Sequence, residues 1–84
     1  MIFCTTFNIN PGSYKKCIRL FKSPLMPEGI KIREFLWMFG VPDALVVFES
    51  PDEETAGEFV IQFGELAEVK TSVVFPIEKL RWVP

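Results

Sequence analysis

Two acidic residues have the type and spacing that proton-transfer chemistry requires. Asp43 and Glu49 stand six positions apart, one at each end of the apolar run 44–48. Two carboxyl groups at the ends of one strand could act as general acid and general base in a cavity. The other interpretation gives Asp43 to the preceding turn, where aspartate is common, and pairs Glu49 with Arg33. We favour this second interpretation and predict no catalytic residue.

The sequence offers little for metal or cofactor chemistry. It contains no histidine, which excludes histidine-based triads, imidazole general bases and histidine ligands. Its two cysteines, Cys4 and Cys17, are thirteen positions apart, and no second pair completes a zinc site of about four ligands. Isolated cysteines are more often small buried hydrophobes than disulfide partners. We predict no bound metal and no cofactor.

Length and composition favour one small domain that needs a partner. A chain of 84 residues and 9.7 kDa has room for one core, so we predict a single domain over residues 1–84. Hydrophobic residues make up 49%, which excludes disorder and exceeds what so small a monomer can bury. A net charge of −2 gives no electrostatic case for nucleic acid.

The sequence shows no signal for export or for membrane insertion. The first residues lack the basic stretch and apolar core of a secretory signal. The longest apolar runs, 35–39 and 44–48, have five residues each, far fewer than the roughly 20 that span a bilayer. We therefore expect a soluble cytoplasmic protein with no membrane partner.

Periodicity in the first third predicts a strand followed by a helix. Large apolar residues alternate with small polar ones over residues 2–9, which indicates a strand. From Tyr14 the apolar residues recur at helical spacing through Phe21. The basic residues of this helix, Lys15, Arg19 and Lys22, could steer an acidic partner, although a solvated helix face is the simpler interpretation.

The remaining chain predicts a hairpin, a second helix and a last strand. Residues 30–39 and 43–49 are two β-rich runs joined by Gly40-Val41-Pro42. Ser50, Pro51 and Glu53 match a capping box, with Ser50 as the N-cap of a helix that ends at Gly64. Residues 69–75 alternate again. The order βαββαβ predicts an α+β ferredoxin-like fold, a four-stranded antiparallel sheet with two helices on one face.

Charge pairing suggests a register for the hairpin. Arg33 opposite Glu49 places Trp37 opposite Leu45, and a slip that sets Glu34 against Glu49 is unfavourable. This register puts alternate apolar residues under the helices: Ile32, Leu36, Met38, Ala44, Val46 and Phe48. With Asp43 at the turn, it gives a candidate ligand or dimer face on the helix-free side: Arg33, Phe35, Trp37, Asp43, Leu45, Val47 and Glu49.

The hairpin and the second helix also resemble a known family. Phe35, Trp37, Gly40 and Asp43, followed by an apolar strand and the Glu49-x-Pro51-Asp52 segment, are similar to the GYD-domain family. The turn departs from that family, because it reads Gly-Val-Pro-Asp. The resemblance implies a dimeric α/β barrel, in which the sheets of two copies face each other.

Two functions follow from this combination. The first is a non-catalytic homodimeric module, or a larger homo-oligomer, that could hold a small molecule between the two sheets. The second is a cofactor-independent enzyme, a small monooxygenase or isomerase, that acts in the barrel cavity. Phe35 and Trp37 could stack on a flat ligand there, but aromatic residues also dominate dimer interfaces, and we favour packing.

Overall fold

The computed structural model describes all 84 residues and has the predicted order of strands and helices. Its elements are β1 (Ile2–Ile9), α1 (Tyr14–Lys22), β2 (Lys31–Trp37), β3 (Ala44–Glu49), α2 (Glu53–Ile61), β4 (Ala67–Val74) and a 3-10 turn, η1 (Ile77–Lys79). The strands form one antiparallel sheet in the order β2-β3-β1-β4. The ferredoxin-like α+β fold is therefore confirmed.

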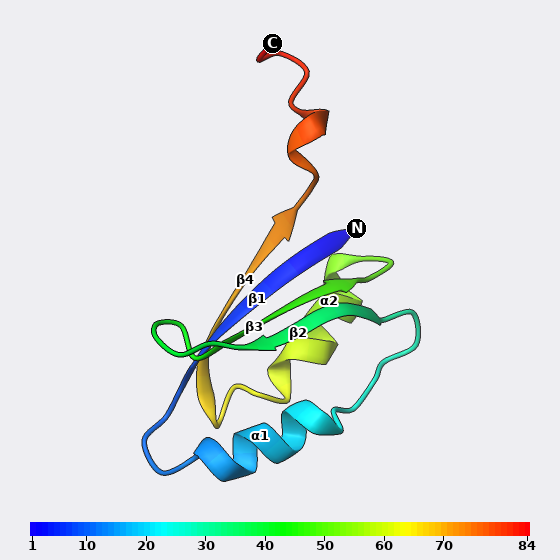
Figure 1. Ribbon diagram of the computed structural model, residues 1–84. Helices are drawn as coiled ribbons and strands as arrows, with labels where there is room; N and C mark the ends of the chain where they lie inside the picture. The colour runs from blue at the N-terminus through cyan, green and yellow to red at the C-terminus, as the bar shows by residue number, and fades with distance from the viewer.

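Both helices lie on the same side of the sheet, and the other side carries no element (Figure 1). Strand β1 shows the consequence, because every second residue is buried, from Phe3 through Thr5 and Phe7 to Ile9. Each helix has nine residues, and neither is long and apolar enough to cross a membrane. The alternation along β1 defines a covered side and an uncovered side for the whole sheet.

Phenylalanine rings fill the covered side. The ring of Phe7 lies 4.8 Å from that of Phe21 on α1 and 5.1 Å from that of Phe63, which follows α2. On the neighbouring strand, Phe48 contacts Phe59 of α2 with ring centroids 4.8 Å apart. Such tilted and edge-on pairs contribute about 0.5–1.5 kcal/mol beyond the area that they bury. The aromatic contacts therefore fix both helices against the sheet.

The predicted register of the hairpin is wrong by one residue. Trp37 pairs with Ala44, not with Leu45, and the Met38 amide donates to the Asp43 carbonyl at 2.8 Å. The cause is the turn, which has four residues rather than three because Phe39 leaves the strand and is fully exposed. A slip of one residue exchanges the faces of a strand. Near the turn, β2 therefore presents the opposite set of side chains.

A bulge farther along the strand adds a second shift of one residue, which restores the predicted faces there but not the predicted pairs. Between Ile32 and Glu34 the pairing shifts by one residue, so that Lys31 lies opposite Glu49. Arg33 is the extra residue, and its Nε atom donates to Glu49 Oε2 at 2.8 Å. The predicted Arg33–Glu49 pair is thus present, although the register from which we derived it is not.

The second helix begins later than predicted. Its N-cap is Asp52, whose Oδ1 atom accepts a hydrogen bond from the Thr55 amide at 2.7 Å. The hydroxyl of Ser50, the predicted cap, donates to the Asp52 carbonyl at 2.7 Å. Ser50 is buried beside the start of the chain, where its amide donates to the Met1 carbonyl. Ser50 therefore organises the approach to the helix and does not cap it.

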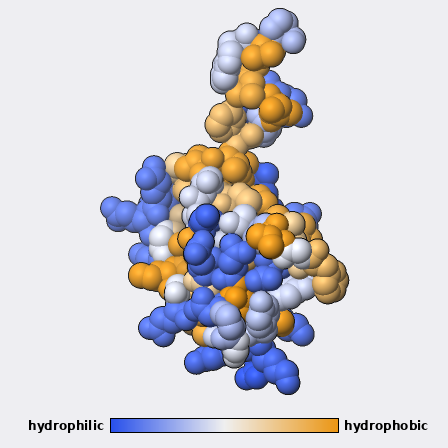
Figure 2. All heavy atoms as spheres, turned by 90° about the vertical axis from the view of Figure 1, so that its left-hand side faces the viewer, coloured by the Kyte–Doolittle hydropathy of each residue, from blue (hydrophilic) through white to orange (hydrophobic).

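The chain after β4 forms a C-terminal arm, residues 75–84, that leaves the domain. Figure 2 shows it standing clear of the body, with hydrophobic atoms on its surface. Phe75, Ile77, Trp82 and Val83 are all exposed. Pro76 has an extended backbone and disfavours a helical conformation in the residue before it, which directs the chain onward from β4. The arm thus adds apolar surface that its own fold does not cover.

Candidate functional site

Six of the seven predicted site residues fall on two sides of the sheet, and the seventh, Asp43, lies at the turn. Arg33, Leu45, Val47 and Glu49 lie on the uncovered side, as predicted. Phe35 and Trp37 lie on the covered side, which corrects the prediction for both of them. Leu36, predicted under the helices, takes their place on the uncovered side. The structure therefore contains two candidate sites.

The first site is the uncovered face, formed by the outward residues of all four strands. Cross-strand pairs place three rows on it: Leu36, Leu45, Thr6 and Lys70; Glu34, Val47, Cys4 and Ser72; Lys31, Glu49, Ile2 and Val74. The central strands β1 and β3 contribute Ile2, Cys4, Leu45 and Val47 to it, together with Thr6 and Glu49. The four apolar side chains are half-buried, although no element lies over them. An apolar centre with a polar border is the usual anatomy of a protein interface.

Charged residues border this face along β2. Arg33 and Glu49 form its one close ion pair, and both side chains remain partly exposed. The hydrogen bond from Arg33, and then its positive charge, lower the pKa of the Glu49 carboxyl. Lys31 and Glu34 complete the border with one charge of each sign. The border thus contains two positive and two negative groups.

Asp43 serves the hairpin and does not face either site. Its Oδ2 atom accepts a hydrogen bond from the Ile9 amide at 2.8 Å, and its own amide donates to the Phe7 carbonyl. These two bonds tie the end of the turn to β1. Burial, and to a smaller extent the charge of Asp43, raise the pKa of the Cys17 thiol in the core. Asp43 therefore has a structural role, in agreement with the interpretation that we favoured.

The two cysteines lie on opposite sides of the sheet. Cys4 is on the uncovered face, between Val47 and Ser72. Cys17 projects from α1 into the core and is fully buried. Both are free thiols. Each thiol therefore reports on one side of the sheet alone.

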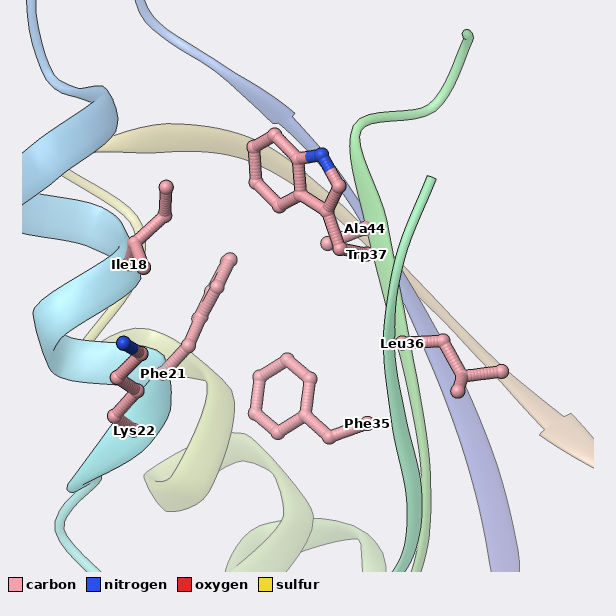
Figure 3. Close-up of a pocket in the computed structure, with 7 residues that line it drawn as sticks. All are labelled: Ile18, Phe21, Lys22, Phe35, Leu36, Trp37 and Ala44. Atoms are coloured by element: carbon pink, nitrogen blue, oxygen red, sulfur yellow. The ribbon is translucent and has the colours of Figure 1, made fainter. Parts of the chain in front are cut away.

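The second site is an aromatic pocket between α1 and the turn end of β2. Its volume is about 230 Å³, and its lining is Ile18, Phe21, Lys22, Phe35, Leu36, Trp37 and Ala44. Figure 3 shows the Trp37 indole reaching from β2 toward Ile18, while the Leu36 side chain points the opposite way. The rings of Phe21 and Phe35 pack at 4.8 Å and join the pocket to the core. Trp37 is 42% exposed and forms part of the mouth.

Lys22 is the only charged residue that lines this pocket. The two ion pairs of the structure, Arg33–Glu49 and Lys70–Glu68, leave its ammonium group without a carboxylate partner. Sequence analysis missed the pocket because it placed Phe35 and Trp37 on the other side of the sheet. The apolar stripe of α1 that includes Ile18 and Phe21 indicated one wall of the pocket. Only the correct register of β2 places Phe35 and Trp37 on the same side of the sheet as that wall.

Comparison with known proteins gives a family and no described activity. Neither the curated proteins nor the solved structures contain a match to this chain. One family model, described as "Domain of unknown function (DUF3303)", matches residues 1–83, which is nearly the whole chain. The chain therefore belongs to the DUF3303 family.

Proposed function

We propose that this protein is a non-catalytic homodimeric module in which two copies pack through their uncovered faces. This is the dimeric α/β-barrel arrangement that the resemblance to the GYD-domain family implies. The observation that carries the proposal is the uncovered face itself, with Ile2, Leu36, Leu45, Val47 and Val74 on the side of the sheet that no helix covers. Covering these side chains removes apolar surface from water, which favours association.

The charged border is compatible with a second copy. A two-fold axis brings one surface against itself, so that a border of one sign would meet its like. Here the border carries two groups of each sign, Lys31 and Arg33 with Glu34 on β2, and Glu49 at the end of β3. Opposite charges can therefore face each other across the axis. Such complementarity gives orientation to a pair more than it gives affinity.

The C-terminal arm gives independent support for self-association. Its residues Ile77 and Trp82 are each 74% exposed, although they are among the most apolar of the chain. Large exposed apolar groups on small domains commonly mark contact surfaces. An arm that points away from its own domain has side chains available to a second copy.

The carboxyl groups favour this module over the enzyme alternative. The enzyme alternative rests on Asp43 or Glu49 as the carboxyl group that exchanges a proton in the barrel. Glu49 is held by Arg33, and its pKa is lowered rather than raised toward neutrality. Asp43 accepts a backbone hydrogen bond at the turn. We therefore do not propose the enzyme.

Val47→Arg tests the proposal, because it places a cation at the centre of the uncovered face. We expect light scattering to give twice the chain mass for the unmodified protein and about 9.7 kDa for the variant. Ile61→Arg makes the same change at an exposed position of α2, on the covered side, and should stay dimeric. An unmodified protein with the mass of one chain, or a dimeric Val47→Arg variant with a native circular dichroism spectrum, would overturn the proposal.

A further inference from the structure

We propose that the aromatic pocket binds a small aromatic carboxylate, with its ring among Phe21, Phe35 and Trp37 and its acid group at Lys22. The pocket lies on the covered side of the sheet. A ligand there therefore does not compete with a second copy on the uncovered face, and this inference does not depend on the proposed dimer.

The shape of the pocket selects a single ring. Phe21 on α1 and Phe35 on β2 are in contact, and the open space lies beside them, between Ile18 and Trp37 (Figure 3). Apolar cavities of about 150 Å³ in proteins take up benzene. A volume of about 230 Å³ therefore accepts one six-membered ring with a short substituent. Aromatic walls favour a flat ring through offset or edge-on contacts.

The charge of the pocket selects an acid. No acidic residue lines the pocket, and Lys22 contributes an ammonium group without a partner. The remaining charged residues of α1, Lys15, Lys16 and Arg19, are also basic. The carbonyl groups at the end of α1 carry a partial negative charge, but the adjacent Arg19 and Lys22 outweigh it. A carboxylate is therefore favoured over an amine or a neutral group.

The location of the charge matches the location of the ring. Lys22 follows Phe21 at the end of α1, so its long side chain begins at the α1 edge of the pocket, whereas Phe35 and Trp37 come from β2. Figure 3 shows the ammonium group beside Phe21, outside the space between the rings. A ligand with its ring in the apolar space therefore holds its carboxylate at the mouth of the pocket, where rotation of the exposed Lys22 side chain brings the ammonium group to it. A charge-assisted hydrogen bond is stronger than a neutral one, so the acid should bind about tenfold more tightly than its neutral amide, a difference of about 1.4 kcal/mol.

Nuclear magnetic resonance of the indole N–H groups gives the test, with phenylacetate as the probe and phenylacetamide as its neutral match. The chain has two tryptophans, so Trp37 reports on the pocket and Trp82, on the C-terminal arm, serves as an internal reference. We expect phenylacetate to shift the Trp37 signal saturably and to leave the Trp82 signal in place. Phenylacetamide should need about tenfold higher concentration.

Two variants separate the charge from the shape. Lys22→Met keeps an apolar chain of similar length and should weaken phenylacetate binding about tenfold without affecting the amide. Lys16→Met removes the same charge from an exposed position outside the pocket and should change neither. A Trp37 signal that does not respond overturns the pocket as a binding site. Equal affinity for acid and amide, or an unchanged affinity in Lys22→Met, overturns its preference for acids.

Discussion

The two sides of strand β2 differ in how far a single chain completes them. On the covered side, Phe35 packs against Phe7 and Phe21, and the pocket beside it is bounded by α1. On the uncovered side, Leu36 joins Leu45 and has nothing above it. One side is a formed concave site of the size of a small molecule, whereas the other is an open sheet of the size of a protein interface.

This difference separates dimer assembly from small-molecule binding, which the sequence-based prediction assigned to one surface. When Phe35 and Trp37 were placed beside Leu45, one surface carried both the dimer and the ligand. The structure divides these residues, so that assembly and small-molecule binding can be tested one at a time. Variants on one side should leave the other side intact.

The largest expected effect distinguishes Phe35 from its neighbour Leu36. In the Val47→Arg background, where we expect a monomer, Phe35→Ala should lower the free energy of unfolding by about 2–3 kcal/mol, because it removes a partly buried ring that packs against the core. Leu36→Ala should cost less than about 1 kcal/mol there, since its side chain is 48% exposed.

Urea unfolding measures both values, and the background variant is the reference. Without Val47→Arg, Leu36→Ala should weaken the dimer more than it weakens the fold. The originally predicted register places Leu36 in the core and Phe35 outside it. A larger loss of unfolding free energy for Leu36→Ala than for Phe35→Ala would therefore support that register, in which one surface carries both the dimer contact and the ligand site.

The elements of the fold follow from local patterns that the sequence displays directly. The alternation over Ile2–Ile9 and the helical spacing from Tyr14 to Phe21 depend on which side chains are apolar, and both elements have the predicted bounds to within a residue or two. These patterns do not depend on contacts between distant residues. The βαββαβ order could therefore be predicted.

The register could not be predicted, because two different arrangements satisfy the same charges. Glu49 can meet Arg33 directly across a three-residue turn, or through a bulge that also brings Lys31 opposite it. Only the second occurs. Phe39 decides between them by leaving the strand, and its apolar side chain gives no sign of this in the sequence. The aromatic pocket depends on that one residue of turn length.

The helix cap shows the same limit on a smaller scale. Ser50 and Asp52 are both good N-cap residues, and each precedes an acidic first turn. Burial decides between them, because Ser50 is only 3% exposed and its backbone is bonded to Met1. A contact between residues so far apart in the chain cannot be seen in a local motif.

Thiol labelling gives a second, smaller contrast between the two sides. Cys4 lies on the uncovered face, so its reaction with a disulfide reagent should be slow at high protein concentration and faster on dilution, as the dimer dissociates. Cys17 should react only on unfolding, because it is fully buried and burial raises the pKa of its thiol.

A Cys4→Ser variant isolates the second thiol and is the control. Its labelling should be negligible at any protein concentration until denaturant is added. A rate for Cys4 that does not depend on concentration would show that no second copy covers this face over the range tested. Rapid labelling of the Cys4→Ser variant would show that α1 opens readily. The covered side would then not protect Cys17 as the structure predicts.

The smallest effect concerns the Arg33–Glu49 pair at the border of the uncovered face. Arg33 lowers the pKa of Glu49 from its ordinary value of 4.5, so the pair stabilises the fold above that pH. This contribution is lost as the pH falls through the lowered pKa and the carboxylate takes up a proton. The midpoint of urea unfolding for Arg33→Met should therefore lie slightly below that of the unmodified protein near neutral pH, and the two should converge in acid. Both side chains are partly exposed, so added salt should reduce the difference.

Arg81→Met, at an exposed position of the C-terminal arm without an ion pair, makes the same substitution and should show no such convergence. A difference for Arg33→Met that persists unchanged into acid would mean that Arg33 acts through the bulge and its packing rather than through the charge of Glu49.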